Sequence, residues 1–279
     1  MPNNKAVMAK LSNKVQWNQA GLFQLSKLKW VNGKGSFEGG KIAVVAKNPK
    51  TGAMAFYLKM SKKALKDAHE GRLHSHKGTG HTIVLKGSVS AIIGGKKLTM
   101  KAGDYFRLPE GVLHQGSIIP GPDPTIMFMI TEGNFDLVYA PEGKKAPVLR
   151  SSLAQKAVNR TALYSLNKLD WKKGTSSFDG GKVAVVSQDR KQNTNVLYLK
   201  MPPKKYEDAH KGRTHSHSAL AHTILLKGTV KAKVNGVELT MKPGDYFRAP
   251  AGFEHKGSHV TGPEPAVMVM ITEGKFGVN

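Results

Sequence analysis

The chain contains one internal repeat, in which matching residues return at a fixed distance of 141 positions, the separation of His74 and His215. His114 and His255 are separated by the same distance, and the correspondence runs without a gap from about residue 20 to residue 135. Repeats in solenoid proteins are only about 20–50 residues long. A period this long indicates two tandem domains with the same fold, each large enough to bury its own core.

We place the domain boundaries where the correspondence begins and ends. The stretch between the repeats is rich in Pro, Lys, Ser and Ala, and Ser151 to Arg160 could form one short helix. The predicted organisation is an N-terminal extension (1–19), a first domain (20–140), a linker with a short helix (141–160) and a second domain (161–279).

Within each repeat, short apolar runs alternate with glycine and proline. Ile42 to Ala46 and Thr82 to Lys86 are two such runs, and turns such as Ala102-Gly103-Asp104 separate them. Many short strands punctuated in this way predict an all-β barrel or sandwich in each half. The chain has no cysteine, which excludes disulfides, thiolate nucleophiles and cysteine-ligated metal sites.

The chain is strongly basic, with 43 Lys and Arg against 19 Asp and Glu and a formal net charge of +24. This charge favours anionic partners. The lysines are scattered through both halves, and neither an arginine-rich tract nor a row of stacking aromatics is present, so we do not expect nucleic acid to be a partner.

No apolar run approaches the ~20 residues of a membrane-spanning helix. The first residues also lack the apolar core of a signal peptide. We expect a soluble protein, with cytoplasm and periplasm both open, since a trimmed mature chain would look the same.

Histidines provide the strongest chemical signal. His74 and His76 flank one residue, so on a strand both side chains point to the same face. His81 follows on the next strand, and His114 comes after a turn at Pro109. The second half repeats the set, and together these are eight of the eleven histidines in the chain: His74, His76, His81, His114, His215, His217, His222 and His255. Converging imidazoles predict one divalent transition metal per domain, with Fe, Mn, Zn, Ni and Cu all suitable.

The spacing around the last histidine of each set resembles a known family. Gly103-x5-Pro109-x-Gly111-x2-His114 fits the second signature of the cupin superfamily, and the equivalent stretch ending at His255 fits it equally. The chain therefore resembles a bicupin. This resemblance implies two tandem jelly-roll barrels (double-stranded β-helices), each with a metal at its narrow end, and pairing of chains through their sheets into a homodimer.

The sequence departs from the cupin pattern at one ligand. Cupins usually have a glutamate as third ligand, seven residues before the closing glycine, whereas His81 lies six residues before Gly87. One step along a regular strand turns the side chain to the other face. Either a bulge restores the inward direction, or three histidines hold the metal. We predict the first alternative, with His81 and His222 as ligands.

Four arginines near the histidines are candidates for binding a substrate carboxylate through two parallel hydrogen bonds. Arg72 and Arg213 adjoin the His-x-His pairs, and Arg107 and Arg248 lie on the run before the second signature. The alternative that these side chains face water stays open.

The resemblance implies a function of one of two kinds. Cupins with neutral ligands are typically dioxygenases, isomerases or decarboxylases, so we expect a metal-dependent enzyme acting on a small anionic, oxygenated substrate. The alternative is a non-catalytic protein that binds or senses a small molecule through its metal, because four protein ligands leave few open coordination positions.

Overall fold

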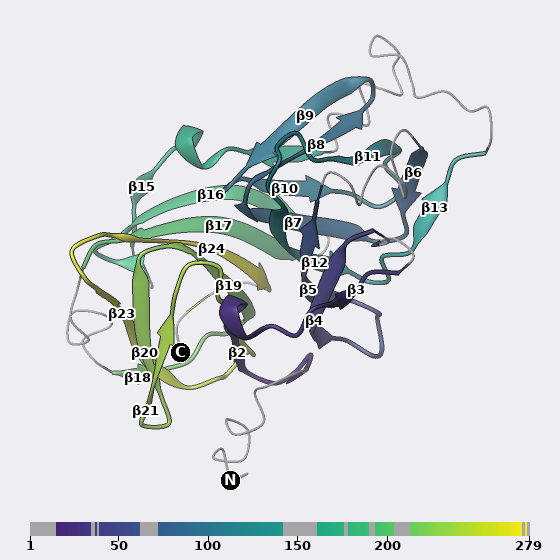
Figure 1. Cartoon of the computed structure of the whole chain (residues 1–279). Helices are drawn as coiled ribbons and strands as arrows, with labels where there is room; N and C mark the ends of the chain where they lie inside the picture. Colours follow the sequence, from purple (N-terminus) through teal and green to yellow (C-terminus); the bar gives the residue numbers. More distant parts are fainter. Residues whose placement is uncertain are drawn as a thin grey trace. The chain divides into compact units, whose positions relative to one another are not determined.

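The computed structural model describes residues 15–34, 37, 39–61, 72–141, 161–175, 178–189, 193–203, 213–274 and 277 (Figure 1). The helix expected at 151–160 and most of the N-terminal extension lie outside the described residues. Strands dominate the described part, as the sequence predicts, and the helices described there are single 3-10 turns: η1 (Leu25–Lys27) and η3 (Leu166–Lys168). Among the described residues, no helix has the length and apolar character that crossing a membrane requires.

The chain divides into two compact units. The unit that we call the first barrel spans residues 29–168, and the second barrel comprises residues 1–28 together with 169–279. The strands assigned to the first barrel are β3 (Val31–Asn32), β4 (Lys41–Lys47), β5 (Met54–Met60), β6 (Leu73–His76), β7 (Thr79–Lys86), β8 (Ser88–Ile93), β9 (Lys96–Lys101), β10 (Tyr105–Leu108), β11 (His114–Ile118), β12 (Thr125–Glu132), β13 (Leu137–Tyr139) and β14 (Ala162–Tyr164). Those assigned to the second are β1 (Val15–Gln16), β2 (Gly21–Phe23), β15 (Lys172–Lys173), β16 (Lys182–Asp189), β17 (Thr194–Met201), β18 (Thr214–His215), β19 (Leu220–Lys227), β20 (Thr229–Val234), β21 (Val237–Met241), β22 (Tyr246–Ala249), β23 (His255–Thr261) and β24 (Ala266–Glu273).

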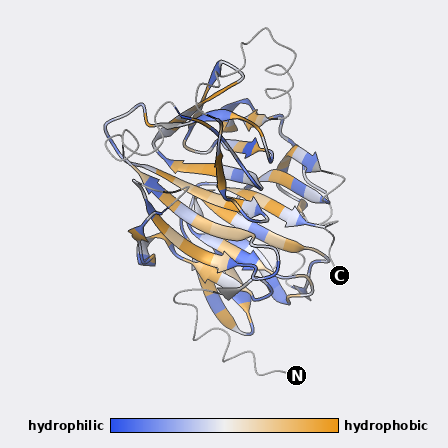
Figure 2. Cartoon of the chain, turned by 90° about the vertical axis from the view of Figure 1, so that its right-hand side faces the viewer, coloured by the Kyte–Doolittle hydropathy of each residue, from blue (hydrophilic) through white to orange (hydrophobic). Residues whose placement is uncertain are grey.

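Two antiparallel sheets form the first barrel. One contains strands in the order β4-β5-β12-β7-β10-β14, with β3 against β4, and the other has the order β13-β6-β11-β8-β9. The central strands of the larger sheet carry continuous apolar runs that are buried on both faces, as in β5 and β12. Orange, apolar stretches are visible along the strands in Figure 2. The inward residues of both sheets meet in one core, which includes Phe56, Leu58, Val84, Met100 and Met127.

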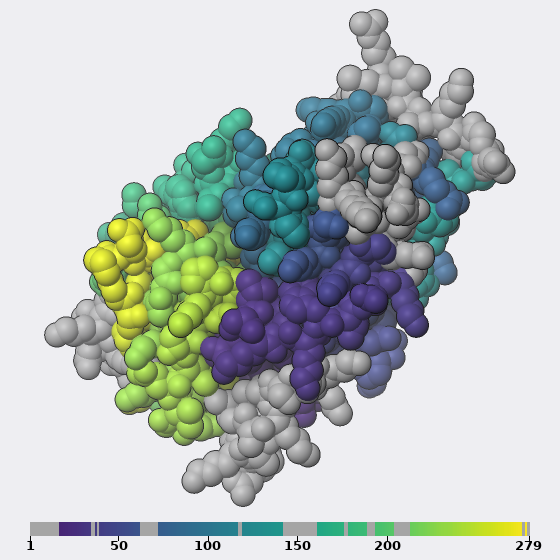
Figure 3. All heavy atoms as spheres, viewed as in Figure 1, coloured from purple at the N-terminus to yellow at the C-terminus, as the bar shows by residue number. Residues whose placement is uncertain are grey.

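The second barrel has the same layout. Its larger sheet has the order β15-β16-β17-β24-β19-β22-β2, and its smaller sheet has the order β18-β23-β20-β21. The residues of β18 to β24 form the yellow-green part of the surface in Figure 3. Its core is built from the counterparts of the first one, such as Leu199, Met241 and Met268.

The first strand of each repeat, β2 or β14, pairs within the other barrel, although the predicted domains begin at 20 and 161. In the second barrel, β2 pairs with β22, and the backbone N–H of Leu25 donates to the Asp245 carboxylate at 2.9 Å. In the first barrel, β14 pairs with β10, and the N–H of Leu166 donates to Asp104 at 3.1 Å. Each barrel thus closes its larger sheet with a strand from a distant part of the chain.

Candidate metal centre

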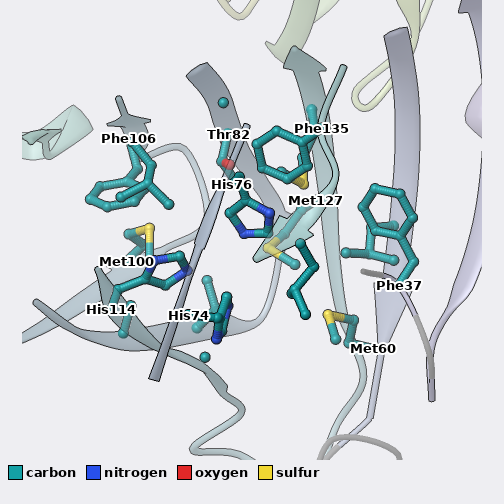
Figure 4. Close-up of a pocket in the computed structure, with 18 residues that line it drawn as sticks. Phe37, Met60, His74, His76, Thr82, Met100, Phe106, His114, Met127 and Phe135 are labelled. Carbon is teal, nitrogen blue, oxygen red and sulfur yellow. The ribbon is translucent and has the colours of Figure 1, made fainter. Parts of the chain in front are cut away.

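Three histidines of the first barrel converge on one point. His74 and His76 lie on the same face of β6, and His114 is the first residue of β11, directly opposite His74 in the antiparallel register. The ring centroid of His114 lies 4.2 Å from that of His74 and 5.2 Å from that of His76. One ring nitrogen from each residue lies within 4.8 Å of the others. Figure 4 shows the three rings directed toward a common space.

Backbone carbonyl groups fix the orientation of two of these rings. The Nδ1 atoms of His74 and His114 lie 2.9 Å and 3.0 Å from the carbonyl oxygens of Arg72 and Val112. A carbonyl oxygen only accepts hydrogen bonds, so each Nδ1 carries the proton and the lone pair of the neutral ring lies on Nε2. This is the arrangement that commonly orients metal-binding histidines.

The second barrel contains the same cluster, made of His215, His217 and His255. The centroid of His255 lies 4.4 Å from that of His215 and 5.1 Å from that of His217. All three Nδ1 atoms lie 3.2–3.3 Å from backbone carbonyl oxygens, those of Arg213, Gly277 and Phe253 respectively. The duplicated histidines therefore occupy duplicated geometry.

The first cluster faces a small, partly open cavity of about 90 Å³. His74, His76 and His114 are all more than nine-tenths buried, and the ring of His76 stacks on Phe135 with centroids 4.0 Å apart. Apart from the histidines, Thr82 is the one residue with a polar side chain among the described residues that line the cavity. The other lining residues are glycine or apolar: Phe37, Leu58, Met60, Gly80, Val89, Ala91, Met100, Phe106, Leu108, Gly116, Met127, Met129, Phe135 and Leu137.

Family models match both repeats. The ChrR Cupin-like domain matches residues 18–136, and the Cupin domain matches residues 200–272. The chain belongs to the cupin superfamily. It is a bicupin, as its histidine signatures predict. Among curated protein sequences, none matches this chain.

Solved structures share the bicupin fold at low sequence identity. A Nostoc punctiforme protein with a proposed dioxygenase activity is 14% identical, with a TM-score of 0.69, covering 92% of this chain and 84% of its own. The Lactobacillus farciminis oxalate decarboxylase is also 14% identical, with a TM-score of 0.55, covering 92% and 87%. Vicilin from Capsicum annuum is 13% identical, with a TM-score of 0.58, covering 92% and 87%. At this identity the likeness shows the fold alone.

The structure does not bring His81 and His222, the predicted fourth ligands, into the two histidine clusters. The register of β7 against β10 is regular here, with Arg107 opposite His81 and Leu108 opposite Gly80, so no bulge turns His81 inward. Gly80 and Thr82 line the cavity, and His81 between them points to the other face of the sheet. The cupin glutamate position is occupied by Gly80, where an added Cβ would lie 2.9 Å from the ring of Phe135.

Both ring nitrogens of His81 have other partners. Nδ1 lies 2.8 Å from the Tyr105 hydroxyl, and Nε2 lies 2.8 Å from the Glu132 carboxylate. Since a carboxylate accepts, Nε2–H donates to Glu132, and Nδ1 then accepts from the Tyr105 hydroxyl. This Tyr-His-Glu network is not predicted from the sequence, although its tyrosine and its glutamate also recur at the repeat distance.

The second barrel has the equivalent network. His222 lies 2.6 Å from the Tyr246 hydroxyl and 3.1 Å from the Glu273 carboxylate. Burial raises the pKa of Tyr246. Burial would also raise the pKa of Glu273, but the hydrogen bond from His222 and the charge of Arg248 outweigh it and lower that pKa. The ring centroid of Trp17 lies 5.4 Å from that of His222.

The structure does not place the candidate arginines at the histidine clusters. Phe106 and Leu108 line the cavity, so Arg107 between them lies on the outer face beside His81. Arg248 is fully buried on the equivalent face, where its Nη1 donates to the Gln19 carbonyl at 2.6 Å.

The other two arginines contribute their backbone rather than their side chains. Arg72 is exposed, with its guanidinium 3.7 Å from the centre of the Tyr139 ring, and Arg213 is exposed as well. Their carbonyl oxygens orient His74 and His215. The predicted arginine clamp has no support in this geometry.

The donor set of each cluster fits a divalent transition metal. Imidazole suits Zn, Cu, Fe and Ni, and each cluster offers three buried or partly buried rings whose nitrogens are already close together. Three protein ligands also leave coordination positions open, which is typical of catalytic rather than structural sites.

Proposed function

We propose that this bicupin is a metal-dependent enzyme that acts on a small anionic, oxygenated substrate by a dioxygenase, isomerase or decarboxylase type of reaction. The proposed ligand sets are His74, His76 and His114 in the first barrel and His215, His217 and His255 in the second. The convergence of three imidazoles on one cavity, two of them oriented by backbone carbonyl groups, is the observation that carries this proposal.

The protein's own groups position and shield the site. The carbonyl groups of Arg72 and Val112 hold two rings in the tautomer that can bind a metal. Phe135 covers one face of His76 and helps to exclude water from the cavity. A divalent ion bound there would act as a Lewis acid on a coordinated oxygen and would lower the pKa of bound water.

The charge of the site favours an anionic ligand. Neutral imidazoles leave the charge of a divalent ion uncompensated, and no carboxylate is among the described residues that line the first cavity. A net charge in an apolar cavity is costly unless an opposite charge accompanies it. An anionic substrate group that coordinates the metal supplies this compensation. The names of the oxalate decarboxylase and the Nostoc protein are consistent with such chemistry.

A second candidate function is metal-dependent binding or sensing without catalysis. It is favoured by the scarcity of acid–base groups, because Thr82 is the one non-histidine residue with a polar side chain among the described lining residues. A hydroxyl of ordinary pKa is a poor general base. Reactions that need a protein base at this cavity are therefore disfavoured, whereas chemistry carried by the metal itself is not.

Metal content is the first test. The protein purified without added metal and then loaded with Co(II) should hold two ions per chain. His74→Ala and His215→Ala should each reduce this to one, and the double variant should bind none. His259→Ala is the matched control, because His259 lies on β23 outside both clusters. Two ions per chain in the double variant would refute the site.

Turnover distinguishes the two functions. The metal-loaded protein should consume oxygen or release carbon dioxide with a small carboxylate or enol substrate, and His74→Ala should abolish at least part of this activity. If several small carboxylates and enols change the Co(II) spectrum but none is turned over, the second function, binding or sensing without catalysis, is favoured.

A further inference from the structure

We infer that the first barrel selects ligands with a single anionic, metal-binding group on a short apolar body, and that it discriminates against dicarboxylates. This inference rests on the proposed metal site and narrows its substrate class. It also separates this chain from the oxalate decarboxylase that shares its fold, because oxalate carries a second carboxylate and has no apolar part.

The walls of the cavity beyond the histidines are apolar. On β7 the inward residues after Gly80 are Thr82 and Val84, and their partners on β12 are Met129 and Met127. Residues two apart on a strand are separated by about 6.6 Å. The apolar wall therefore continues for two layers away from Gly80, and the hydroxyl of Thr82 is its one polar side-chain group among the described lining residues.

Within the part of the chain that the structure describes, no cationic side chain lines this apolar region. Arg107 lies on the outer face of the sheet, and the guanidinium of Arg72 is stacked on Tyr139. Neither a lysine nor an arginine is among the described residues that line the cavity. A second carboxylate would therefore lose its hydration without gaining a partner. The same surface would favour a hydrocarbon group.

The size of the cavity limits the ligand. About 90 Å³ is far below the ~300–1,000 Å³ of pockets for drug-sized molecules. Only a few carbon atoms behind the metal-binding group can be buried within it. The preferred ligand is thus a short-chain monoanion rather than a long amphiphile.

A chain-length series tests this specificity directly. The His215→Ala variant loaded with Co(II) reports on the first barrel alone, and its visible spectrum is titrated with acetate, propionate, butyrate and succinate. Each methylene buried in an apolar wall should tighten binding about fourfold until the cavity is full. Succinate has the length of butyrate with the terminal methyl replaced by a carboxylate, so it should bind at least tenfold more weakly than butyrate.

A wall variant and a control complete the test. Met127 lines the cavity, so Met127→Ala should enlarge it. The affinity should then keep rising to longer carboxylates than in the protein with Met127. Met54→Ala is the control, since Met54 packs against the core without lining the cavity. Equal binding of succinate and butyrate by Co(II)-loaded protein would overturn the inference while leaving the metal site intact. Failure to take up Co(II) would overturn both.

Discussion

Replacing His222 by leucine should destabilise the second barrel without removing its metal. His222 and Tyr246 are both fully buried, and the distance between the His222 ring nitrogen and the Tyr246 hydroxyl is 2.6 Å. Loss of this hydrogen bond between two buried groups costs about 1–3 kcal/mol. The lost bond to Glu273 adds less, about 0.5–1 kcal/mol, because that side chain is 41% exposed and water can replace the donor.

The expected total is a decrease of about 1.5–4 kcal/mol in the free energy of unfolding. A second substitution gives a sharper test. In the His222→Leu background, the Tyr246 hydroxyl no longer bonds to His222, so Tyr246→Phe should destabilise the protein by about 1 kcal/mol less than it does in the wild type. Equal costs of Tyr246→Phe in the two backgrounds would show that the two side chains are not coupled.

Urea unfolding followed by tryptophan fluorescence is a suitable assay, since Trp17 packs near His222 and reports on the second barrel. The chain has two compact units, so separate transitions are fitted rather than one. His81→Leu is the matched variant and should shift the transition of the first barrel instead. Co(II) stoichiometry is measured in parallel and should stay at two ions per chain. Loss of one ion in His222→Leu would refute the reasoning and restore His222 as a ligand.

Two further predictions concern the second barrel. Gly244→Ala should lower the free energy of unfolding by about 1–3 kcal/mol. The reason is that Gly244 has φ +88° and an added Cβ would lie 2.5 Å from the side chain of Leu25. Gly252→Ala is the control and should cost less in the same urea assay, because Gly252 has φ +74° but nothing within 4 Å of an added Cβ. Because the pKa of Glu273 is lowered in the folded state, its contribution to stability is present above its unfolded pKa and is lost as the pH falls through the lowered value. Unfolding free energies measured from about pH 5 to about pH 3 should fall less steeply in Glu273→Gln, and an unchanged slope would contradict this assignment.

The paired histidines could be predicted because strand geometry is rigid. Side chains two apart on a strand share a face, so the spacing of His74 and His76 was sufficient to place both rings together. The same rule placed His81 one step out of phase with the cupin glutamate. The prediction that it ligates followed the family pattern and required a bulge. In the structure the register at Arg107 is regular, and His81 lies on the face that strand parity predicts.

The exchange of the first strands could not be predicted from the sequence. Leu25 and Leu166 occupy equivalent positions in the two repeats, and each packs against the equivalent glycine, Gly244 or Gly103. Because the repeats are alike, the first strand of a repeat would make the same local contacts in either barrel. It could pair with the barrel that follows it in the chain or with the other one. The pattern of apolar residues therefore predicts a strand and its partner surface, but not which copy of that surface it uses.

The duplicated histidines also show why recurrence at a fixed distance is weak evidence for ligation. His81 recurs as faithfully as His74, yet its two nitrogens are engaged by Tyr105 and Glu132, so it has no lone pair directed at the cavity. His74 has its Nδ1 proton engaged by a backbone carbonyl, which places a lone pair on the remaining nitrogen. A residue that recurs at the repeat distance indicates that both barrels need that side chain. The partners of each ring nitrogen show whether a recurring histidine has a structural role or is able to bind a metal. For His81 this could be predicted from strand parity, because its neighbours Gly80 and Thr82 face the cavity and His81 therefore does not.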